Sequence, residues 1–171
     1  MLDPPEYVNW HLEAVNRLRE QRPAEARELL EKSEAARPKL SGTQGEQAFD
    51  EFRDCDDLFA PILELMVLFD YIWLPLEQIQ ELEIAQPEHP RDLLWAPARF
   101  VLTDGSQRRG YVPVLYGETY TQDDDELKMG RMTDWQGAEG GPITGLGRRQ
   151  FLLGDETPSL LELGTLEFNK S

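Results

Sequence analysis

The feature that most constrains the fold is a change of hydrophobic period near Asp70. Before this residue, apolar side chains recur every three to four positions, whereas beyond it they alternate or form short runs. Pro, Gly and Asp separate the runs, as turn residues separate strands. The pattern predicts an α+β protein in which helices precede a β-rich unit. Five segments combine bulky aromatic or aliphatic residues with such turn residues: DCDDLFAPILE from Asp54, YIWLPLEQI from Tyr71, RDLLWAPARFVLTDG from Arg91, YVPVLY from Tyr111 and MTDW from Met132.

Residues 5–20 and 24–36 predict two helices, because each carries one apolar stripe with i, i+3, i+4 spacing. Pro23 between them suits the first turn of the second helix. Together they predict a helical hairpin of tetratricopeptide (TPR) type over residues 1–39. A single hairpin of this type does not bury its apolar face alone, so we expect it to pack on the rest of the chain, on a second copy or on a partner. The inward side chains are Tyr7, Trp10, His11, Ala14, Leu18, Ala26, Leu29, Leu30 and Ser33.

The segment after the hairpin is acidic. Residues 40–57 are predicted to form an acidic loop, and their second part, 46–57, holds six acidic residues and one Arg. Asp56 or Asp57 is predicted to cap a third helix. That helix is predicted over residues 58–69, where apolar side chains repeat with helical spacing.

Beyond the change of period, turn residues alternate with short apolar runs, as in an antiparallel sheet. Asp104-Gly105 predicts the turn of a hairpin, and Pro75 predicts the start of a helical turn. We therefore expect an α+β fold in which the TPR-like hairpin and the third helix pack with a small antiparallel β-sheet or barrel-like unit. This α+β domain is predicted over residues 58–166, with a tail at 167–171. The expected strands are residues 71–74, 81–84, 99–103, 108–115, 127–132, 150–153 and 160–163.

The charge of the chain excludes several classes of partner. With 17 basic and 33 acidic residues, the formal net charge is −16, and residues 40–171 carry 25 of the acids and 10 of the bases. A surface of this sign repels phosphate groups, so we expect neither nucleic acid nor anionic membrane as a partner. It favours basic protein surfaces.

The sequence also predicts where the protein acts. Its start, MLDPPEYVNW, has neither the basic region nor the apolar core of a signal peptide. The longest apolar stretch, residues 58–69, is too short to span a bilayer. Cys55 is the only cysteine, so the chain forms no internal disulfide. We expect a cytoplasmic protein without membrane insertion.

One acidic cluster has a catalytic interpretation beside a structural one. Asp54, Asp56 and Asp57 have the side chains of a general acid/base pair or of a metal site, although capping accounts for at least one of them. His11 lies on the apolar side of the first helix and His89 in a connector, and neither has a Ser or Cys close by in the manner of a triad. We expect no catalytic, cofactor-binding or metal-binding residue. A small hydrolase or ligand-binding enzyme that uses the three aspartates is the alternative.

Two further segments have both a binding and a structural interpretation. Residues 140–149 combine four glycines with two arginines, which suits an anion, but they lack the Lys-Ser/Thr ending of a phosphate loop. A connector is therefore the expectation. Trp73, Trp95 and Trp135 fit either an aromatic binding face or half-buried core positions, and we expect the core positions.

Several short motifs follow one another in a fixed order and spacing: Asp54-Cys55-Asp56, Pro61-Ile62-Leu63-Glu64, Tyr71-Ile72-Trp73-Leu74-Pro75, Arg91-Asp92-Leu93-Leu94-Trp95 with Pro97-Ala98, Thr133-Asp134-Trp135 and Gly145-Leu146-Gly147. This arrangement resembles the ImpE/SciE family, also called TagJ, accessory proteins of type VI secretion gene clusters. The resemblance extends from about Pro5 to Leu163. It implies a non-enzymatic protein of the secretion machinery. Family members typically have a longer TPR-like N-terminal region, and at least some relatives bind the N-terminal helix of the small contractile-sheath subunit.

The sequence and the resemblance together predict an adaptor that binds a helix of a sheath component. An amphipathic partner helix would lie in a groove, and the helical hairpin is the expected wall of that groove because a lone hairpin leaves apolar surface uncovered. Self-association of the hairpin, which would give a homodimer, is a further alternative. The candidate partner-binding residues are Tyr7, Trp10, His11, Leu18 and Leu29.

Overall fold

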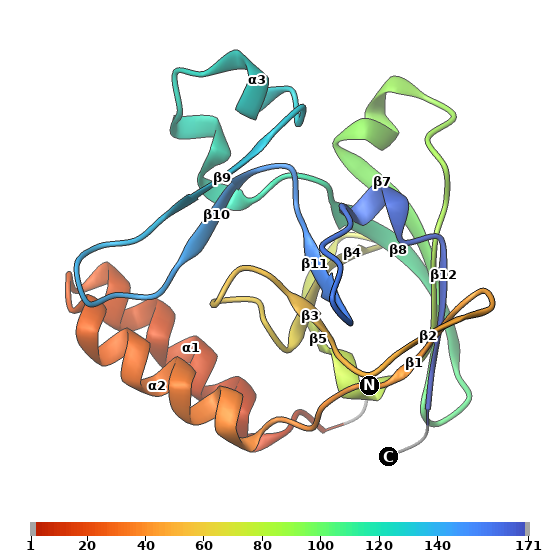
Figure 1. The fold of residues 1–171 in the computed structure, drawn as a ribbon, viewed down its shortest axis with the longest axis horizontal. Coiled ribbons are helices and arrows are strands. Elements are labelled where there is room, and N and C mark those ends of the chain that lie inside the picture. The colour runs from red at the N-terminus through yellow and green to blue at the C-terminus, as the bar shows by residue number, and fades with distance from the viewer. Residues whose placement is uncertain (1–2, 170–171) are drawn as a thin grey trace.

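The computed structural model describes residues 3–169, in which two long helices lie beside a large antiparallel sheet (Figure 1). The helices are α1 (Glu6–Arg19), α2 (Pro23–Ala36) and the short α3 (Asp125–Lys128). Single helical turns occur at Leu76–Gln78, Pro90–Leu93, Gly117–Thr121 and Leu160–Glu162. The strands are β1 (Gly42–Gln44), β2 (Gln47–Phe49), β3 (Phe52–Asp54), β4 (Ile62–Val67), β5 (Asp70–Pro75), β6 (Ile79–Ile84), β7 (Trp95–Leu102), β8 (Gln107–Pro113), β9 (Thr133–Gln136), β10 (Thr144–Gly147), β11 (Phe151–Leu153) and β12 (Thr165–Phe168).

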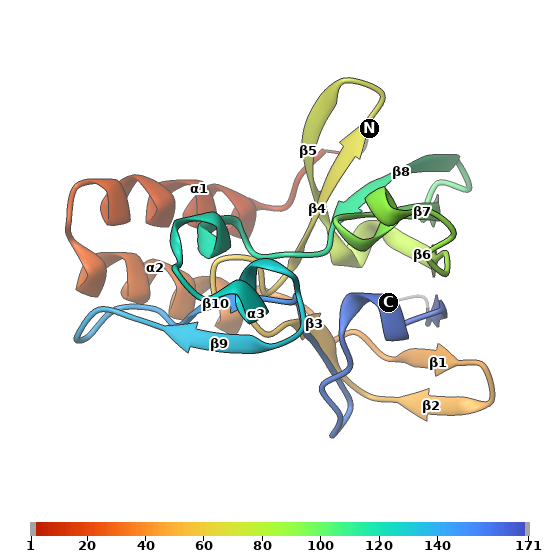
Figure 2. The ribbon, with the colours of Figure 1, turned by 90° about the horizontal axis from the view of Figure 1, so that it is seen from above.

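Eight strands form the main sheet, in the order β2-β1-β12-β6-β7-β8-β4-β5, and every neighbouring pair is antiparallel. β9 pairs with β10, and β3 pairs with β11, in two small additional sheets. Figure 2 shows the β4–β5 hairpin standing out from the rest of the sheet. The α+β class is confirmed, and the sheet is larger than we predicted.

One face of the main sheet carries the hydrophobic core. Alternate residues of each strand point to this face, as the two-residue period requires. In β4 these residues are Leu63 and Leu65, and in β7 they are Ala96, Ala98 and Phe100, all buried in the same cluster. Phe52 and Phe151 stack in the core with their ring centroids 5.2 Å apart. The opposite, outer face of the sheet therefore presents the remaining alternate residues.

Most of the predicted elements form where the sequence placed them. α1 and α2 match the two expected helices, and α2 begins at Pro23 as expected. The hairpin of β7 and β8 turns at Asp104-Gly105, where Gly105 has a φ of +82°. A side chain with a Cβ adopts such an angle only with strain, so glycine suits the turn.

The predicted third helix over residues 58–69 is wrong. Residues 62–67 form strand β4, which pairs with β5 along its whole length. Both faces of this strand are largely buried, so its apolar run contains the helical spacing by coincidence. A short run that is apolar on both faces does not distinguish a buried strand from a buried helix.

Three further predictions of local structure are wrong for identifiable reasons. The acidic segment 40–57 is not a loop, because its backbone forms β1, β2 and β3, of which β1 and β3 pair with distant strands, and Phe49 and Phe52 enter the core. Residues 127–132 are not a strand, because the Asp124 side chain accepts a hydrogen bond from the Glu126 amide at 2.8 Å and caps α3. Residues 160–163 form a helical turn, which a reciprocal cap between Ser159 and Glu162 stabilises.

Candidate functional site

The apolar face of the helical hairpin packs on the outer face of the sheet, at the end of β4 and β5. Tyr7 and Val8 of α1 contact Ile62 of β4 in a small buried cluster, and Trp10 and Trp73 pack against it. Ile62 and Tyr7 are almost completely buried. We expected the hairpin to pack on the rest of the chain, on a second copy or on a partner, and the structure shows that it packs on the rest of the chain.

His11 ties the hairpin together and to the following segment. Its Nδ1 lies 2.8 Å from the Leu58 carbonyl oxygen, and its Nε2 lies 2.7 Å from the Ser33 hydroxyl. These contacts assign the neutral tautomer that donates from Nδ1 and accepts from the hydroxyl. Burial lowers the pKa of His11 to about 4, so the ring is neutral at pH 7. This arrangement stabilises the helix packing.

The other three candidate partner-binding residues are half-buried within the hairpin. Leu18 and Leu29 pack against a second small cluster between α1 and α2. The Lys32 ammonium lies 4.0 Å from the centroid of the Trp10 ring, where a cation–π interaction holds it. All five candidates, Tyr7 and His11 included, therefore have packing partners within the chain.

The three aspartates form a clasp that joins residues 54–57 to the distant segment 143–150. Asp56 accepts hydrogen bonds at 2.8 Å from the amides of Leu58 and Gly145. Asp57 accepts one at 2.8 Å from the Ile143 amide. Burial raises the pKa of Asp56 to about 7. We call Asp54, Asp56 and Asp57 with their partners the Asp clasp.

Arg149 is the buried centre of the Asp clasp. Its guanidinium donates to Asp54 Oδ2 at 2.9 Å and also to Glu64 Oε2. The Tyr116 hydroxyl lies 2.9 Å from Asp54 Oδ1, on the other carboxylate oxygen. Burial alone would lower the pKa of Arg149, but the two carboxylates raise it above its usual range, so Arg149 stays charged. The network holds β3, β4 and the segment around Tyr116 in fixed positions.

The Gly145-Leu146-Gly147 motif has a structural explanation in the same region. A Cβ at Gly145 would overlap the Tyr116 ring, and Gly147 has a φ of +80°. Both positions therefore require glycine for close packing and for backbone conformation. The predicted connector at 140–149 contains strand β10.

The burial of Asp54 and Asp56 does not favour the hydrolase alternative. Each oxygen of Asp54 and Asp56 accepts at least one hydrogen bond within the chain, and both side chains are buried. Asp57 bonds the Arg53 guanidinium and the Ile143 amide through its two oxygens. A general base must be able to reach a substrate, and burial keeps Asp54 and Asp56 away from one, whereas Asp57 is partly exposed and lines a pocket. Within residues 3–169, no group of three His, Cys, Asp or Glu side chains has the geometry to hold a metal ion.

The outer face of the sheet has an open part beside the hairpin. The strand register places Tyr71 of β5 beside Met66 of β4, Met66 beside Tyr111 of β8, and Tyr111 beside Pro97 of β7. Side chains of directly paired residues point to the same face, so these four form one row across the sheet. A parallel row ends at Trp95, which pairs with Pro113.

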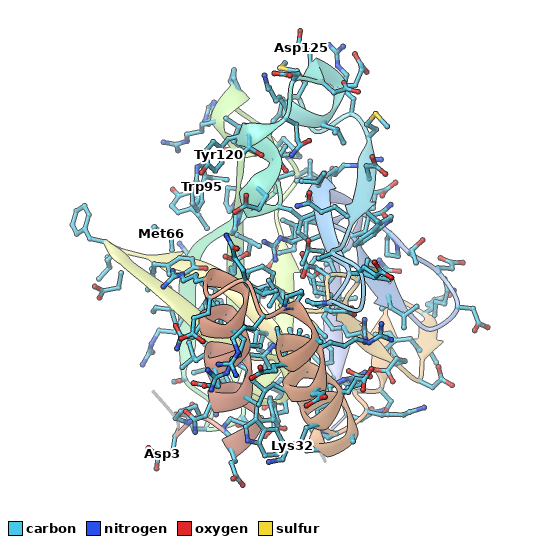
Figure 3. The ribbon with its side chains drawn as sticks, turned by 90° about the vertical axis from the view of Figure 1, so that its left-hand side faces the viewer. Asp3, Lys32, Met66, Trp95, Tyr120 and Asp125 are labelled. Atoms are coloured by element: carbon cyan, nitrogen blue, oxygen red, sulfur yellow. The ribbon has the colours of Figure 1, made fainter. Side chains whose placement is uncertain are left out.

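A groove of about 580 Å³ runs between these rows and the segment that follows β8. Tyr120, on the helical turn 117–121, is 79% exposed, while Tyr71 is 54% and Trp95 41% exposed. Figure 3 shows Met66, Trp95 and Tyr120 on the side of the molecule that also carries α1 and α2. We call this set the aromatic face, and it consists of the exposed residues Tyr71, Leu94, Trp95, Tyr111 and Tyr120 together with the half-buried Met66. The groove is lined by Glu64, Tyr71, Leu94, Trp95, Pro113, Leu115, Tyr116, Gly117, Thr119, Tyr120 and Lys128.

Sequence reasoning found this face only in part. The sequence predicts a half-buried core position for Trp95 and indicates no binding role for Tyr71, Tyr111 or Tyr120. A signal was present in Trp95-Ala96-Pro97-Ala98, where bulky and small residues alternate. The small residues point to the core and the bulky ones to the outer face. Trp73 and Trp135 do not belong to the aromatic face. Trp73 lies under the hairpin, and Trp135 packs against Tyr116 with ring centroids 5.9 Å apart.

Comparisons with known proteins place these features in a family context. The model of the ImpE protein family matches residues 46–167. The type VI secretion system accessory component TagJ of Pseudomonas aeruginosa is 32% identical over 165 residues, which are 96% of this chain and 57% of that protein. A crystal structure of a Vibrio parahaemolyticus protein shares the fold with a TM-score of 0.89 and 24% identity, over 100% of this chain and 64% of that one. The chain thus spans less than two thirds of the length of either protein. Among residues 3–169, no helix is both long and apolar enough to cross a membrane.

Proposed function

Because the chain belongs to the ImpE family, we propose that it acts as an accessory protein of a type VI secretion system. The similarity to a protein named for that role, which extends over nearly the whole chain, supports the proposal. The protein would work in the cytoplasm by binding another protein and not by catalysis. The hydrogen bonds that occupy the three aspartates agree with a binding role.

The observation that carries a binding role is the aromatic face. Tyr71, Trp95 and Tyr120 are large, exposed and adjacent to one groove. Aromatic residues are enriched at protein interfaces and often supply most of the binding energy. An exposed apolar patch of this kind marks an interaction site more often than a chance arrangement. We therefore assign partner docking to the aromatic face.

We propose a helix of a sheath component as the partner. An amphipathic helix presents apolar side chains at i, i+3, i+4 and i+7, which suits an elongated apolar groove. The segment 117–131 supplies four residues of the groove lining, and it contains five acidic and two basic residues. This charge, together with the net charge of −16, favours a basic partner.

The TPR-like hairpin is the second candidate surface. Trp10 is half-buried under Lys32, and Leu12 of the same helix is exposed, so the outer side of α1 offers one apolar contact. A partner or a second copy of the chain could dock there, with Tyr7, His11, Leu18 and Leu29 as supports. The aromatic face is the stronger candidate because it combines several exposed aromatic side chains with a groove.

Capture of purified sheath subunits by the immobilised protein tests the proposal. We expect the wild-type chain to retain a sheath subunit, Tyr120→Ala to weaken retention about tenfold or more, and Trp10→Ala to change it little. Weakening by Trp10→Ala alone would move the site to the hairpin. Failure of the wild-type chain to bind any secretion component would contradict the proposed function.

A further inference from the structure

We infer that the groove of the aromatic face holds a basic side chain, Arg or Lys, of the docked partner, an inference that rests on the proposed docking function. The groove joins aromatic rings to one carboxylate, and this combination selects a cation over a purely apolar group. The chemistry of the pocket thereby specifies one residue of the partner.

Aromatic side chains line the groove on several sides. Tyr71 comes from β5, Trp95 from β7, and Tyr116 and Tyr120 from the segment after β8. The face of an aromatic ring carries partial negative charge and attracts an ammonium or guanidinium group within about 6 Å of its centroid. The same protein already uses this interaction, since Lys32 lies over the Trp10 ring and Arg149 lies 5.0 Å from the Tyr116 centroid.

Glu64 supplies the carboxylate of the groove. Its Oε1 accepts the hydrogen bond of the Tyr71 hydroxyl, and its Oε2 accepts that of Arg149. A carboxylate offers about four lone-pair sites, so two acceptor sites remain for a donor that enters the groove. The side chain is 10% exposed and lies among the residues that line the groove. A cation bound there would donate a hydrogen bond to a largely buried carboxylate. Such a bond is strong because both groups are charged.

The remaining lining suits the stem of a long basic side chain. Leu94, Pro113 and Leu115 are apolar and lie beside the aromatic rings. Lys and Arg bury their methylene groups on apolar surface while the charged end reaches a polar partner. A groove of about 580 Å³ is large enough for such a side chain together with part of the helix that carries it.

Among the described residues, Lys128 is the one basic residue that lines the groove. Its ammonium group is therefore the cation that competes with a basic side chain of the partner. Lys128 lies at the end of α3 and is exposed. A flexible lysine at the rim repels a second cation and can occupy the same space. Its removal should therefore strengthen the binding of a basic side chain, whereas the removal of a lysine that only covers apolar surface should not. The segment 117–131, which supplies four residues of the lining, carries five acidic and two basic residues, and this charge near the groove disfavours an anionic ligand.

The test uses the full chain and small probes in place of the unidentified partner. N-acetyl-arginine amide is the cationic probe and N-acetyl-leucine amide its apolar control, and the indole N–H signal of Trp95 reports binding by NMR. Trp95→Phe assigns that signal. We expect the arginine probe to shift it with saturation, the leucine probe to shift it less, and Lys128→Ala to tighten arginine binding by about two- to fivefold.

Two lining variants and one control complete the test. Glu64→Gln should weaken arginine binding by about two- to fivefold. Tyr120→Ala changes an exposed side chain, so it should weaken arginine binding to the same extent without affecting the fold. Glu83→Gln is the matched control, because Glu83 is a carboxylate of the outer face that pairs with Arg99 outside the groove. Its arginine affinity should equal that of the wild type.

Equal shifts from the arginine and leucine probes would overturn the inference, and so would an arginine affinity that neither Glu64→Gln nor Lys128→Ala changes. These results are distinguishable from failure of the proposed function. If the sheath subunit still binds and Tyr120→Ala weakens it, the aromatic face is a docking site that takes an apolar side chain. If no secretion component binds, the docking function fails whatever the probes show.

Discussion

The outer face of the main sheet has a covered half and an open half, and their side chains are similar in kind. In the covered half, Ile62 and Trp73 lie beneath Tyr7, Val8 and Trp10 of the hairpin. In the open half, Tyr71, Trp95 and Tyr111 remain exposed. Both halves belong to neighbouring strands of one sheet and show the same alternation of residues. The comparison teaches that apolar character identifies the outer face, but only the packing of the hairpin decides which part stabilises the fold and which part is free to bind.

The two halves meet at Arg149, so the largest effect is expected there. The Arg149 Cζ lies 5.0 Å from the ring of Phe59, which packs on Trp73 in the covered half, and 5.0 Å from the ring of Tyr116 in the open half. Arg149→Met leaves Asp54 and Glu64 buried without their cation. We expect the free energy of unfolding to fall by about 3–5 kcal/mol in chemical denaturation at pH 8.

The pH dependence of the Arg149→Met variant supplies its control. Burial raises the pKa of Asp54, so this carboxyl group is more easily protonated at pH 5, and the loss of stability should be smaller there than at pH 8. An equal loss at both pH values would show that the side chain acts through its volume and not through its charge.

A pair of truncations contrasts the two halves directly. Ile62→Ala in the covered half removes a completely buried side chain, and we expect it to lower the free energy of unfolding by about 2–4 kcal/mol. Tyr120→Ala in the open half removes a side chain that is 79% exposed, and it should change stability by about 0.5 kcal/mol or less. Thermal and chemical denaturation measure both effects. Comparable losses in the two variants would contradict the division into halves.

The hairpin and the Asp clasp should respond to pH in opposite directions. His11 lies in α1 of the hairpin, and between pH 6.5 and about 4 the unfolded chain binds a proton there that the folded protein does not. Acidification through this range therefore lowers the free energy of unfolding, by at most about 1.4 kcal/mol per pH unit. Asp56, in the Asp clasp, holds a proton in the folded protein between about pH 3.8 and 7 that the unfolded chain has released, so acidification raises the free energy of unfolding.

Single variants separate these opposing contributions. Relative to the wild type, His11→Gln should become more stable as the pH falls from 6.5 to 4.5, and Asp56→Asn should become less stable over the same range. Burial raises the pKa of Asp54 too, so Asp56→Asn should remove only part of the effect of the acids. Urea titrations at several pH values measure the slopes. Parallel profiles for both variants would contradict the assigned protonation states.

A small stabilising effect is expected at the tip of the β4–β5 hairpin, beside the open half. Leu68 has a φ of +58° and is 87% exposed, so it adopts a strained backbone conformation with little burial in return. Leu68→Gly removes the strain, and we expect the free energy of unfolding to rise by up to about 1 kcal/mol. Leu68→Ala keeps the strain and serves as the control. Destabilisation by glycine would indicate that the Leu68 side chain contributes packing within the chain.

The sequence predicted the helices and most strands because local signals specify them. The stripe from Tyr7 to Leu18 and the position of Pro23 determine the hairpin, and Asp104-Gly105 determines the turn between β7 and β8. Strand β4 was mistaken for a helix because the burial of both its faces depends on α1 and on the core, which lie far away in the sequence. Tertiary contacts of this kind do not appear in local periodicity.

The candidate site was harder to predict than the fold. The sequence left a catalytic role open for Asp54, Asp56 and Asp57, because Gly145 and Arg149, which bind these carboxylates, lie about 90 positions away in the chain. The sequence predicted an uncovered apolar surface on the hairpin, because Ile62, which contacts that surface in the fold, is also remote from it in sequence. Trp95 and Tyr71 line one groove only because the sheet order places β5, β4, β8 and β7 side by side. Residue types alone could therefore name the members of the aromatic face but not assemble them.

A hydrogen-exchange footprint of the sheath subunit on this chain tests the central claim most directly. The account predicts slower exchange in β5, in the residues around Trp95 and in the turn 117–121 when the subunit is bound, with α1 and α2 unchanged. Tyr120→Ala should remove the footprint at the same subunit concentration. Protection confined to α1 and α2, with the aromatic face still exchanging freely, would contradict the claim that the open half of the sheet is the docking surface.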